Sequence, residues 1–168
     1  MGISHGNLNP HNILIFKNKW DYGMRAKLSH FCCSAGTETP RWQAPEQLDK
    51  KHGDMYSDKY VLGYILHFCI IGEHMFGKFK DDGEIYNLDE CNNLVKLGVL
   101  CLPKSKLLPE AIYLITELSH LKPTDMLSLE HLGLDLPIFW NNFKRGYLML
   151  ELHNKLKKLK SHSMHINI

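Results

Sequence analysis

The sequence predicts a mostly α-helical domain with one small β-hairpin near its N-terminus. Two apolar, β-prone runs at 13–16 and 24–28 flank a segment rich in Asn, Asp and Gly, a pattern typical of a hairpin turn. An apolar run at 60–72 and an amphipathic segment at 109–121 predict helices. With 168 residues, of which 44% are hydrophobic, the chain can bury one domain core.

The segment between the hairpin and the apolar run is expected to be a loop, because residues 32–45 contain Gly, Pro and small polar side chains. Pro45 suits the first turn of a short helix that follows. Ser57 and Asp58 are good N-cap residues for a helix at 59–71. Because this helix is apolar on nearly every face, we expect it to be central and covered all round.

The second half of the chain is expected to be helical with loops. Residues 78–84 read as a polar loop, and 86–99 support at most one helix. Pro109 opens the amphipathic helix, whose apolar face carries positions 111, 112, 115 and 118. Residues 134–160 begin with a helix breaker and aromatic side chains and end in a lysine-rich helix.

Charge and cysteine content narrow the class of protein. The formal net charge is +2 and the 20 basic residues are spread along most of the chain, which does not indicate a general grip on nucleic acid. Five cysteines without a C-x-x-C pair indicate reduced thiols in a cytosol-facing protein. The run at 60–72 is interrupted by His67 and is shorter than the roughly 18–20 residues of a membrane span. We see no signal peptide.

Four stretches carry the functional information: SHGNLNPHNILI at 4–15, KLSHFCC at 27–33, GTETPRWQAPEQL at 36–48 and YSDKYVLGYILHF at 56–68. In this order they resemble the catalytic loop, the metal-binding D-F-G segment, the end of the activation segment and the central helix of a protein kinase C-terminal lobe. The words NPHNILI, WQAPEQL, LPEAIYLITEL and LPIFWNN are similar, more narrowly, to the inositol-requiring kinase/endoribonuclease family of unfolded-protein sensors, particularly its plant members.

This resemblance covers about residues 4–150 and implies a fold: a kinase-like C-terminal lobe, a helical bundle with a small hairpin, over 1–140. A basic amphipathic helix or tail is expected at 141–168. No Gly-rich loop occurs in the 168 residues, so we expect the N-terminal lobe, with its strand lysine and helical glutamate, to lie outside them.

The resemblance also implies a degenerate catalytic site. Asn7 stands at the position of the catalytic base and Asn9 at that of the phosphate-facing lysine, while Asn12 is retained as a possible metal ligand. His30 stands at the position of the magnesium-binding aspartate. An amide cannot act as a general base, and the loss of a general base alone lowers the rate by about 10²- to 10⁴-fold. Magnesium prefers oxygen ligands, so the imidazole of His30 is a poor replacement for the aspartate. The family uses ATP and magnesium, and the sequence predicts that their chemistry is lost.

Two further residues have structural roles by resemblance. Asp58 matches the central-helix aspartate that hydrogen-bonds the catalytic-loop backbone, with a helix cap as the alternative. Glu46 would pair with a buried arginine near the end of the lobe, but the matching region offers Met126 or Leu127. We therefore expect Glu46 to be an unpaired buried carboxylate, which would cost stability.

Three groups of residues have competing interpretations. A zinc or copper site is weighed against ordinary buried or solvated histidines, because the spacing of the candidate ligands matches no zinc pattern. The hydroxyl residues of the loop are either sites of activation-segment phosphorylation or ordinary loop residues. The lysine-rich end either contacts a membrane or a partner, or is a solvated helix terminus. The residues concerned are His5, His11, His30, Cys32 and Cys33 for the metal, Ser34, Thr37 and Thr39 for the loop, and 155–160 for the lysine-rich end.

The sequence thus favours a pseudokinase fragment of the unfolded-protein-sensor type that acts as a binding or scaffolding module, with a kinase-type dimer partner possible by resemblance. The rival is an ATP-binding serine/threonine kinase whose N-terminal lobe lies outside the chain. A third reading is a lobe that is unstable alone, because the surface that the N-terminal lobe covers would be exposed. The expected location is the cytoplasmic side, with endoplasmic-reticulum association through a longer parent protein. The chain itself reads as a fragment, a short protein or a decaying copy.

Overall fold

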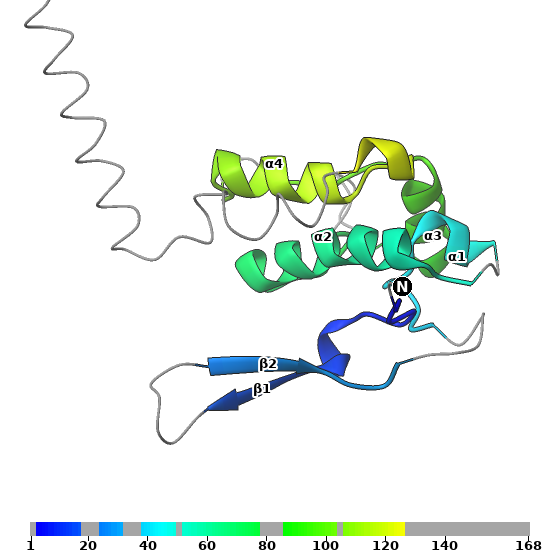
Figure 1. The fold of residues 1–168 in the computed structure, drawn as a ribbon. Helices are drawn as coiled ribbons and strands as arrows, with labels where there is room; N and C mark the ends of the chain where they lie inside the picture. The colour runs from blue at the N-terminus through cyan, green and yellow to red at the C-terminus, as the bar shows by residue number, and fades with distance from the viewer. Residues whose placement is uncertain are drawn as a thin grey trace, which may run out of the picture. The chain divides into compact units, whose positions relative to one another are not determined.

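The computed structural model describes residues 3–17, 24–31, 38–49, 52–77, 86–103 and 106–126. Within these ranges the chain is mostly helical and contains a two-stranded antiparallel sheet, so the predicted combination of helices and one small hairpin is confirmed (Figure 1). The predicted boundary at 140 and the basic tail lie outside the described residues. In the part of the chain that is described, no helix is both long enough and apolar enough to cross a bilayer.

The hairpin consists of β1 (Ile13–Lys17) and β2 (Met24–Leu28). Ile13 lies opposite Leu28 and Lys17 opposite Met24. A short 3₁₀ turn, η1 (Pro10–Asn12), leads directly into β1. Because the pairing continues from Ser29 N to Asn12 O at 2.9 Å, the hairpin holds the segment before β1 next to the segment after β2.

The central helix α2 (Met55–Ile71) begins earlier than the sequence predicted. Asp54 Oδ1 accepts hydrogen bonds from the backbone N–H of Tyr56 at 2.8 Å and of Ser57 at 3.1 Å, and Ser57 Oγ accepts from Asp54 N–H. The prediction of Ser57 or Asp58 as N-cap was therefore wrong. Asp54 provides a reciprocal cap three residues ahead of Ser57, which makes Ser57 part of the first turn.

The middle of α2 forms the core together with α4 (Pro109–Leu118), which lies alongside it in Figure 1. Tyr60 and Tyr64 are fully buried, and their hydroxyl groups lie 3.0 Å apart. The buried side chains of α4 are Ala111, Leu114, Ile115 and Leu118, close to the predicted apolar face. The expectation that α2 is covered all round was wrong at its C-terminal end, where Ile70 is 43% exposed.

Two shorter helices complete the described fold. The helix α1 (Pro45–Leu48) contacts both α2 and α3 (Leu88–Lys96). Asn87 Oδ1 accepts the Glu90 N–H at 2.9 Å while the Glu90 carboxylate accepts the Asn87 N–H at 2.8 Å, a reciprocal cap that starts α3. A 3₁₀ turn, η2 (Pro123–Asp125), follows α4.

His74 ties the turn after α2 to the loop before α1. Its Nε2 donates to the carbonyl oxygen of Arg41 at 3.0 Å, and its Nδ1 accepts the backbone N–H of Phe76 at 3.2 Å. The ring also packs edge-on against Trp42, with centroids 4.7 Å apart. Burial lowers the pKa of His74 to about 4. Both ring nitrogens are thus used by the neutral form, and a second proton would face the Phe76 N–H.

This arrangement predicts a loss of stability in mild acid. The folded-state pKa of His74 lies below its unfolded value of 6.5, so its contribution is complete above pH 6.5 and falls as the pH drops toward 4. Between pH 7.5 and pH 5 the free energy of unfolding should fall by about 2 kcal/mol through this group. Urea unfolding at both pH values checks it. A His74→Gln variant, which keeps a donor and an acceptor but does not titrate, should show a flatter pH dependence by that amount; an equally steep one would contradict the assignment.

Gly63 sets the closeness of α2 and α4. A Cβ atom at this position would lie 2.2 Å from Ser119 Oγ and 3.2 Å from the carbonyl oxygen of Ile115. Ser119 in turn donates from Oγ to the carbonyl oxygen of Tyr60 at 3.3 Å. The helices therefore meet where one of them has no side chain.

Gly63→Ala is expected to destabilise the fold by about 1–3 kcal/mol, because overpacking outweighs the gain in helix propensity. Removing the nearest atom with Ser119→Ala in the same chain should recover part of this loss. Thermal or urea unfolding of the two single variants and the double variant measures both effects. If the costs of the two single substitutions simply add, the contact between these positions does not limit the packing.

Candidate functional site

The segment 5–12 is anchored to α2 by one carboxylate. Asp58, in the first turn of α2, accepts the backbone N–H of His5 on Oδ2 at 2.6 Å and that of Gly6 on Oδ1 at 3.0 Å. Gly6 has a φ of 74°, a left-handed conformation that glycine adopts without a steric cost. Asp58 is therefore an anchor of this segment and does not cap α2.

A second anchor comes from α1. Gln47 is 3% exposed; its Nε2 donates to the carbonyl oxygen of Gly6 at 2.9 Å, and its Oε1 accepts the backbone N–H of Ala44 at 3.0 Å. The neighbouring Glu46 accepts a hydrogen bond on Oε1 from the hydroxyl of Ser57. The expectation that Glu46 is an unpaired buried carboxylate was therefore wrong, because Ser57 supplies a donor where the resemblance implied an arginine.

The three asparagines of the segment form a cluster with Thr39, which we call the amide cluster (Asn7, Asn9, Asn12 and Thr39). Asn7 Oδ1 accepts the backbone N–H of Thr39 at 2.9 Å, its hydroxyl at 3.0 Å, and Asn9 Nδ2 at 3.2 Å. Asn9 Nδ2 also lies 3.0 Å from Thr39 Oγ1, and Asn12 Nδ2 donates to the carbonyl oxygen of Asn7 at 2.8 Å. Every side chain of the cluster is neutral.

Two histidines flank the amide cluster and have different surroundings. His5 is buried, donates from Nε2 to the carbonyl oxygen of Ser29 at 2.8 Å, accepts the Asn7 N–H on Nδ1, and packs on Phe31 with centroids 4.5 Å apart. His30 is exposed, has a φ of 57°, and its Nδ1 lies 3.0 Å from Ser29 Oγ.

The neutral form of His5 therefore has both ring nitrogens engaged. His5 and His30 meet the same residue, Ser29, from different sides. Among the residues that the structure describes, no group of three or more His, Cys, Asp and Glu side chains is placed to hold a metal ion. Of the other candidates for a soft-metal site, His11 is exposed, while Cys32 and Cys33 lie outside the described residues, as do Ser34 and Thr37.

The chemistry available to the amide cluster is hydrogen bonding without proton transfer. An amide oxygen that already accepts three donors has no basic lone pair for a substrate hydroxyl. Among the described residues, no lysine or arginine side chain contributes to the bonds around Asn7 and Asn9. The described arrangement can organise a loop, and it supplies neither a base nor a counter-charge for a phosphate.

Sequence reasoning missed Thr39 and Gln47. Thr39 was interpreted as one of several loop residues, because its partner Asn7 is 32 positions away in the chain. Gln47 had a readable signal, since it stands at the third helical position, where a Gln side chain commonly reaches back to the N-cap N–H.

No family model matches. The chain is 30% identical over 172 aligned residues to an "inactive serine/threonine-protein kinase/endoribonuclease IRE1-like" of Arabidopsis thaliana, covering 91% of this chain and 28% of that protein. It is 33% identical over 162 residues to serine/threonine-protein kinase/endoribonuclease IRE1a of the same plant, covering 86% and 18%. With the rice IRE1 of that description it shares 29% identity over 160 residues, covering 84% and 16%.

These similarities support a relation of the chain to kinase-like proteins. More narrowly, the chain resembles the IRE1 kinase/endoribonuclease family, as the motifs predicted. It spans between 16% and 28% of the length of these curated relatives, so their whole-protein activities do not transfer by similarity alone.

The anchoring by Asp58 predicts a specific local loss. Asp58→Asn should lower the free energy of unfolding by about 1.5–3 kcal/mol, because one of two hydrogen bonds to a charged acceptor is lost and the other becomes neutral. Amide hydrogen exchange should accelerate at His5 and Gly6 before it does in α4. Asp89→Asn, at an exposed position in the first turn of α3, is the matched control. Unchanged exchange at His5 and Gly6 would contradict an anchoring role.

Proposed function

We propose that the chain is a catalytically degenerate, pseudokinase segment with the fold of a kinase C-terminal lobe, related to the unfolded-protein-response kinase/endoribonucleases. Its role is to bind or scaffold other groups. It does not transfer phosphate, and it uses neither ATP nor magnesium for catalysis.

The observation that carries this proposal is the closed amide cluster. By resemblance, Asn7 and Asn9 stand where a kinase has its base and its phosphate-facing lysine. Here both side chains bond to each other and to Thr39. Asn7 and Asn9, at positions that in a kinase contact the substrate and the phosphate, here stabilise the loop by hydrogen bonds.

The position of His30 supports the same proposal. By resemblance it replaces the aspartate that binds magnesium, and within the described residues its side chain bonds to Ser29 Oγ. Magnesium prefers oxygen ligands in octahedral geometry. One of the relatives carries the word "inactive" in its name, and this agrees with the proposal that the present chain is inactive as a kinase.

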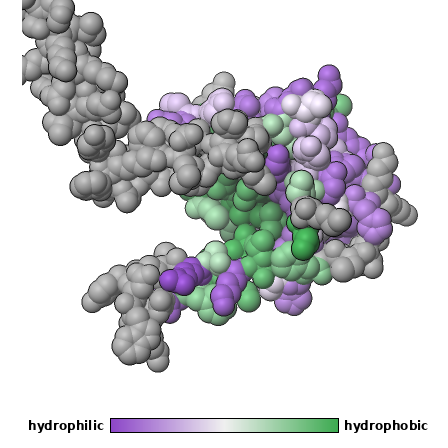
Figure 2. All heavy atoms as spheres, viewed as in Figure 1, coloured by the Kyte–Doolittle hydropathy of each residue, from purple (hydrophilic) through white to green (hydrophobic). Residues whose placement is uncertain are grey.

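A binding role needs an exposed surface, and the hairpin offers one. Leu14 is 43% exposed, Ile15 61%, Phe16 46% and Leu28 49%. Figure 2 shows hydrophobic residues gathered on the visible face between the hairpin and the helices. Exposed apolar area of this kind marks interaction surfaces in soluble proteins. A kinase-type dimer partner, or the remaining part of a longer parent chain, is the occupant that the resemblance suggests.

The second candidate is an ATP-binding serine/threonine kinase whose N-terminal lobe lies outside this chain. Asn12 favours it, because the residue that resembles a metal ligand is kept, and it is buried next to the loop with Nδ2 bonded to Asn7 O. The names of several relatives include kinase activity. The two candidates differ in one measurable property, the transfer of phosphate.

Incubated with labelled ATP, magnesium and a generic protein substrate, the chain is expected to transfer no more phosphate than a heat-denatured sample. The reason is the absence of a base and of a phosphate-facing cation. Asn12→Ala serves as the matched variant and should behave like the wild type. Transfer above the denatured control that disappears in Asn12→Ala would establish the kinase and reject the pseudokinase.

The natural context requires its own measurement. We propose a cytoplasmic-side location, with endoplasmic-reticulum association through a longer parent protein. An immunoblot against this segment, combined with transcript length and membrane fractionation, decides it. A product much larger than 19.5 kDa in the membrane fraction is expected. A product of 19.5 kDa in the soluble fraction would reject the longer parent.

A further inference from the structure

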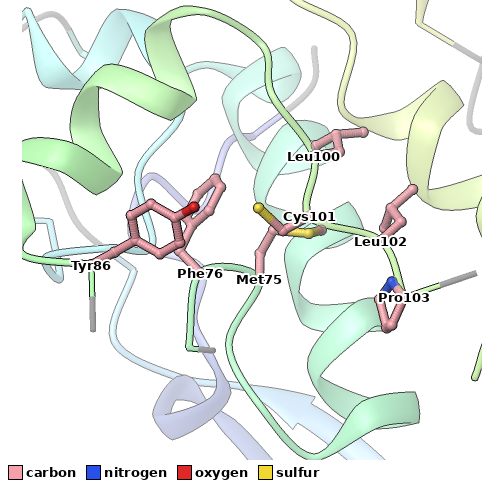
Figure 3. A pocket seen from close by; sticks show the side chains of 7 residues that line it. All are labelled: Met75, Phe76, Tyr86, Leu100, Cys101, Leu102 and Pro103. Carbon is pink, nitrogen blue, oxygen red and sulfur yellow. The ribbon is translucent and has the colours of Figure 1, made fainter. Parts of the chain in front are cut away.

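A cavity of about 360 Å³ lies between the turn after α2, the approach to α3 and the segment that follows α3 (Figure 3). We call it the Cys101 pocket; its lining residues are Met75, Phe76, Tyr86, Leu100, Cys101, Leu102 and Pro103. Its volume is at the lower end of the roughly 300–1,000 Å³ typical of small-molecule sites. None of these residues belongs to the amide cluster.

The side chains of the Cys101 pocket are arranged by kind. Figure 3 shows the rings of Phe76 and Tyr86 at one end, the sulfur atoms of Met75 and Cys101 in the middle, and Leu102 and Pro103 at the other end. The two rings are nearly perpendicular, with centroids 6.5 Å apart. The cavity therefore presents aromatic, thiol and thioether, and aliphatic surfaces in sequence.

The walls are held by the core. Met75 and Phe76 are each 1% exposed, and Phe76 packs edge-on against the buried Tyr64 at 5.8 Å. The carbonyl oxygen of Tyr86 accepts Arg41 Nη2 at 2.9 Å. A cavity whose walls are already ordered loses little conformational entropy when a ligand enters.

The lining selects against charge. None of the seven side chains is an acid or a base at neutral pH, and burial raises the pKa of the Cys101 thiol, which keeps it protonated. An ionised ligand would lose hydration here, and none of the seven lining side chains offers it a counter-charge. An aromatic ring, by contrast, gains contact with the partly exposed Tyr86 ring and Cys101 thiol.

We propose that the Cys101 pocket is a binding site for a neutral, planar aromatic molecule of one or two rings. The proposal does not depend on the inactivity of the amide cluster, because the two sites share no residue. Ring stacking against Tyr86 and contact with Cys101, Leu102 and Pro103, which are all partly exposed, would hold the ligand above the buried Met75 and Phe76.

Prodan, a neutral two-ring naphthalene whose fluorescence shifts to the blue in apolar surroundings, tests this on the full chain. We expect saturable binding with one site and a blue shift. Cys101→Trp and, separately, Leu102→Trp fill the cavity and should each weaken binding at least tenfold. Cys69→Trp places the same ring at an exposed position of α2 and should leave the affinity unchanged.

Two comparisons locate the bound probe. Phe16→Ser, on the exposed hairpin, should not change the Prodan affinity, and the anionic naphthalene 1-anilinonaphthalene-8-sulfonate should compete at least tenfold more weakly than neutral 2-naphthol. Circular dichroism checks that each variant is folded, and two independent filling variants keep the test decisive if one is not. No saturable binding, binding that survives both filling variants, or binding lost in Phe16→Ser would overturn the proposal.

Discussion

Two hydrogen bonds from backbone N–H groups to the Asp58 carboxylate connect the segment that carries the amide cluster to the helical core. They fix His5 and Gly6 against the first turn of α2, and the later turns of that helix pack on α4. Gln47 adds a third bond to the same loop. The hairpin starts where this loop ends, so its position follows from the same carboxylate. A charged acceptor suits this task, since hydrogen bonds to ionised groups are stronger than neutral ones.

The loop held in this way contains a self-satisfied set of neutral groups. In the amide cluster, Asn7 is an acceptor for Thr39 and Asn9, and its backbone carbonyl serves Asn12. A carboxylate at position 7 could accept the same donors but would add a negative charge, and among the described residues no lysine or arginine side chain bonds to Asn7. The asparagines hold the loop with neutral groups, which suits the proposed binding role.

The apolar surfaces of the described chain differ in character. The hairpin is an open surface with large side chains on both of its faces, suited to another protein surface. The Cys101 pocket is concave, bounded by buried side chains and free of charge, suited to a small molecule. The first depends on β1 and β2, while the second depends on the packing of Phe76 against the helical core. A ligand in the pocket would therefore act on the core, and a partner on the hairpin would act on the loop.

The sequence by itself determined the mostly helical composition, the hairpin, the amphipathic face of α4 and the resemblance to the IRE1 family, because these follow from local periodicity, turn residues and ordered motifs. By resemblance it also predicts that Asn7 and Asn9 stand at positions where a kinase has charged residues. The Asp54 cap of α2 is a local contact with Ser57 that the sequence interpretation overlooked. Only the tertiary structure decided that Ser57 donates a hydrogen bond to Glu46 and that Thr39 completes the amide cluster. The physical reason is distance along the chain: a hydrogen bond between residues 7 and 39 leaves no periodic trace in the sequence, and the choice of partner is made when the loop, α1 and α2 come together.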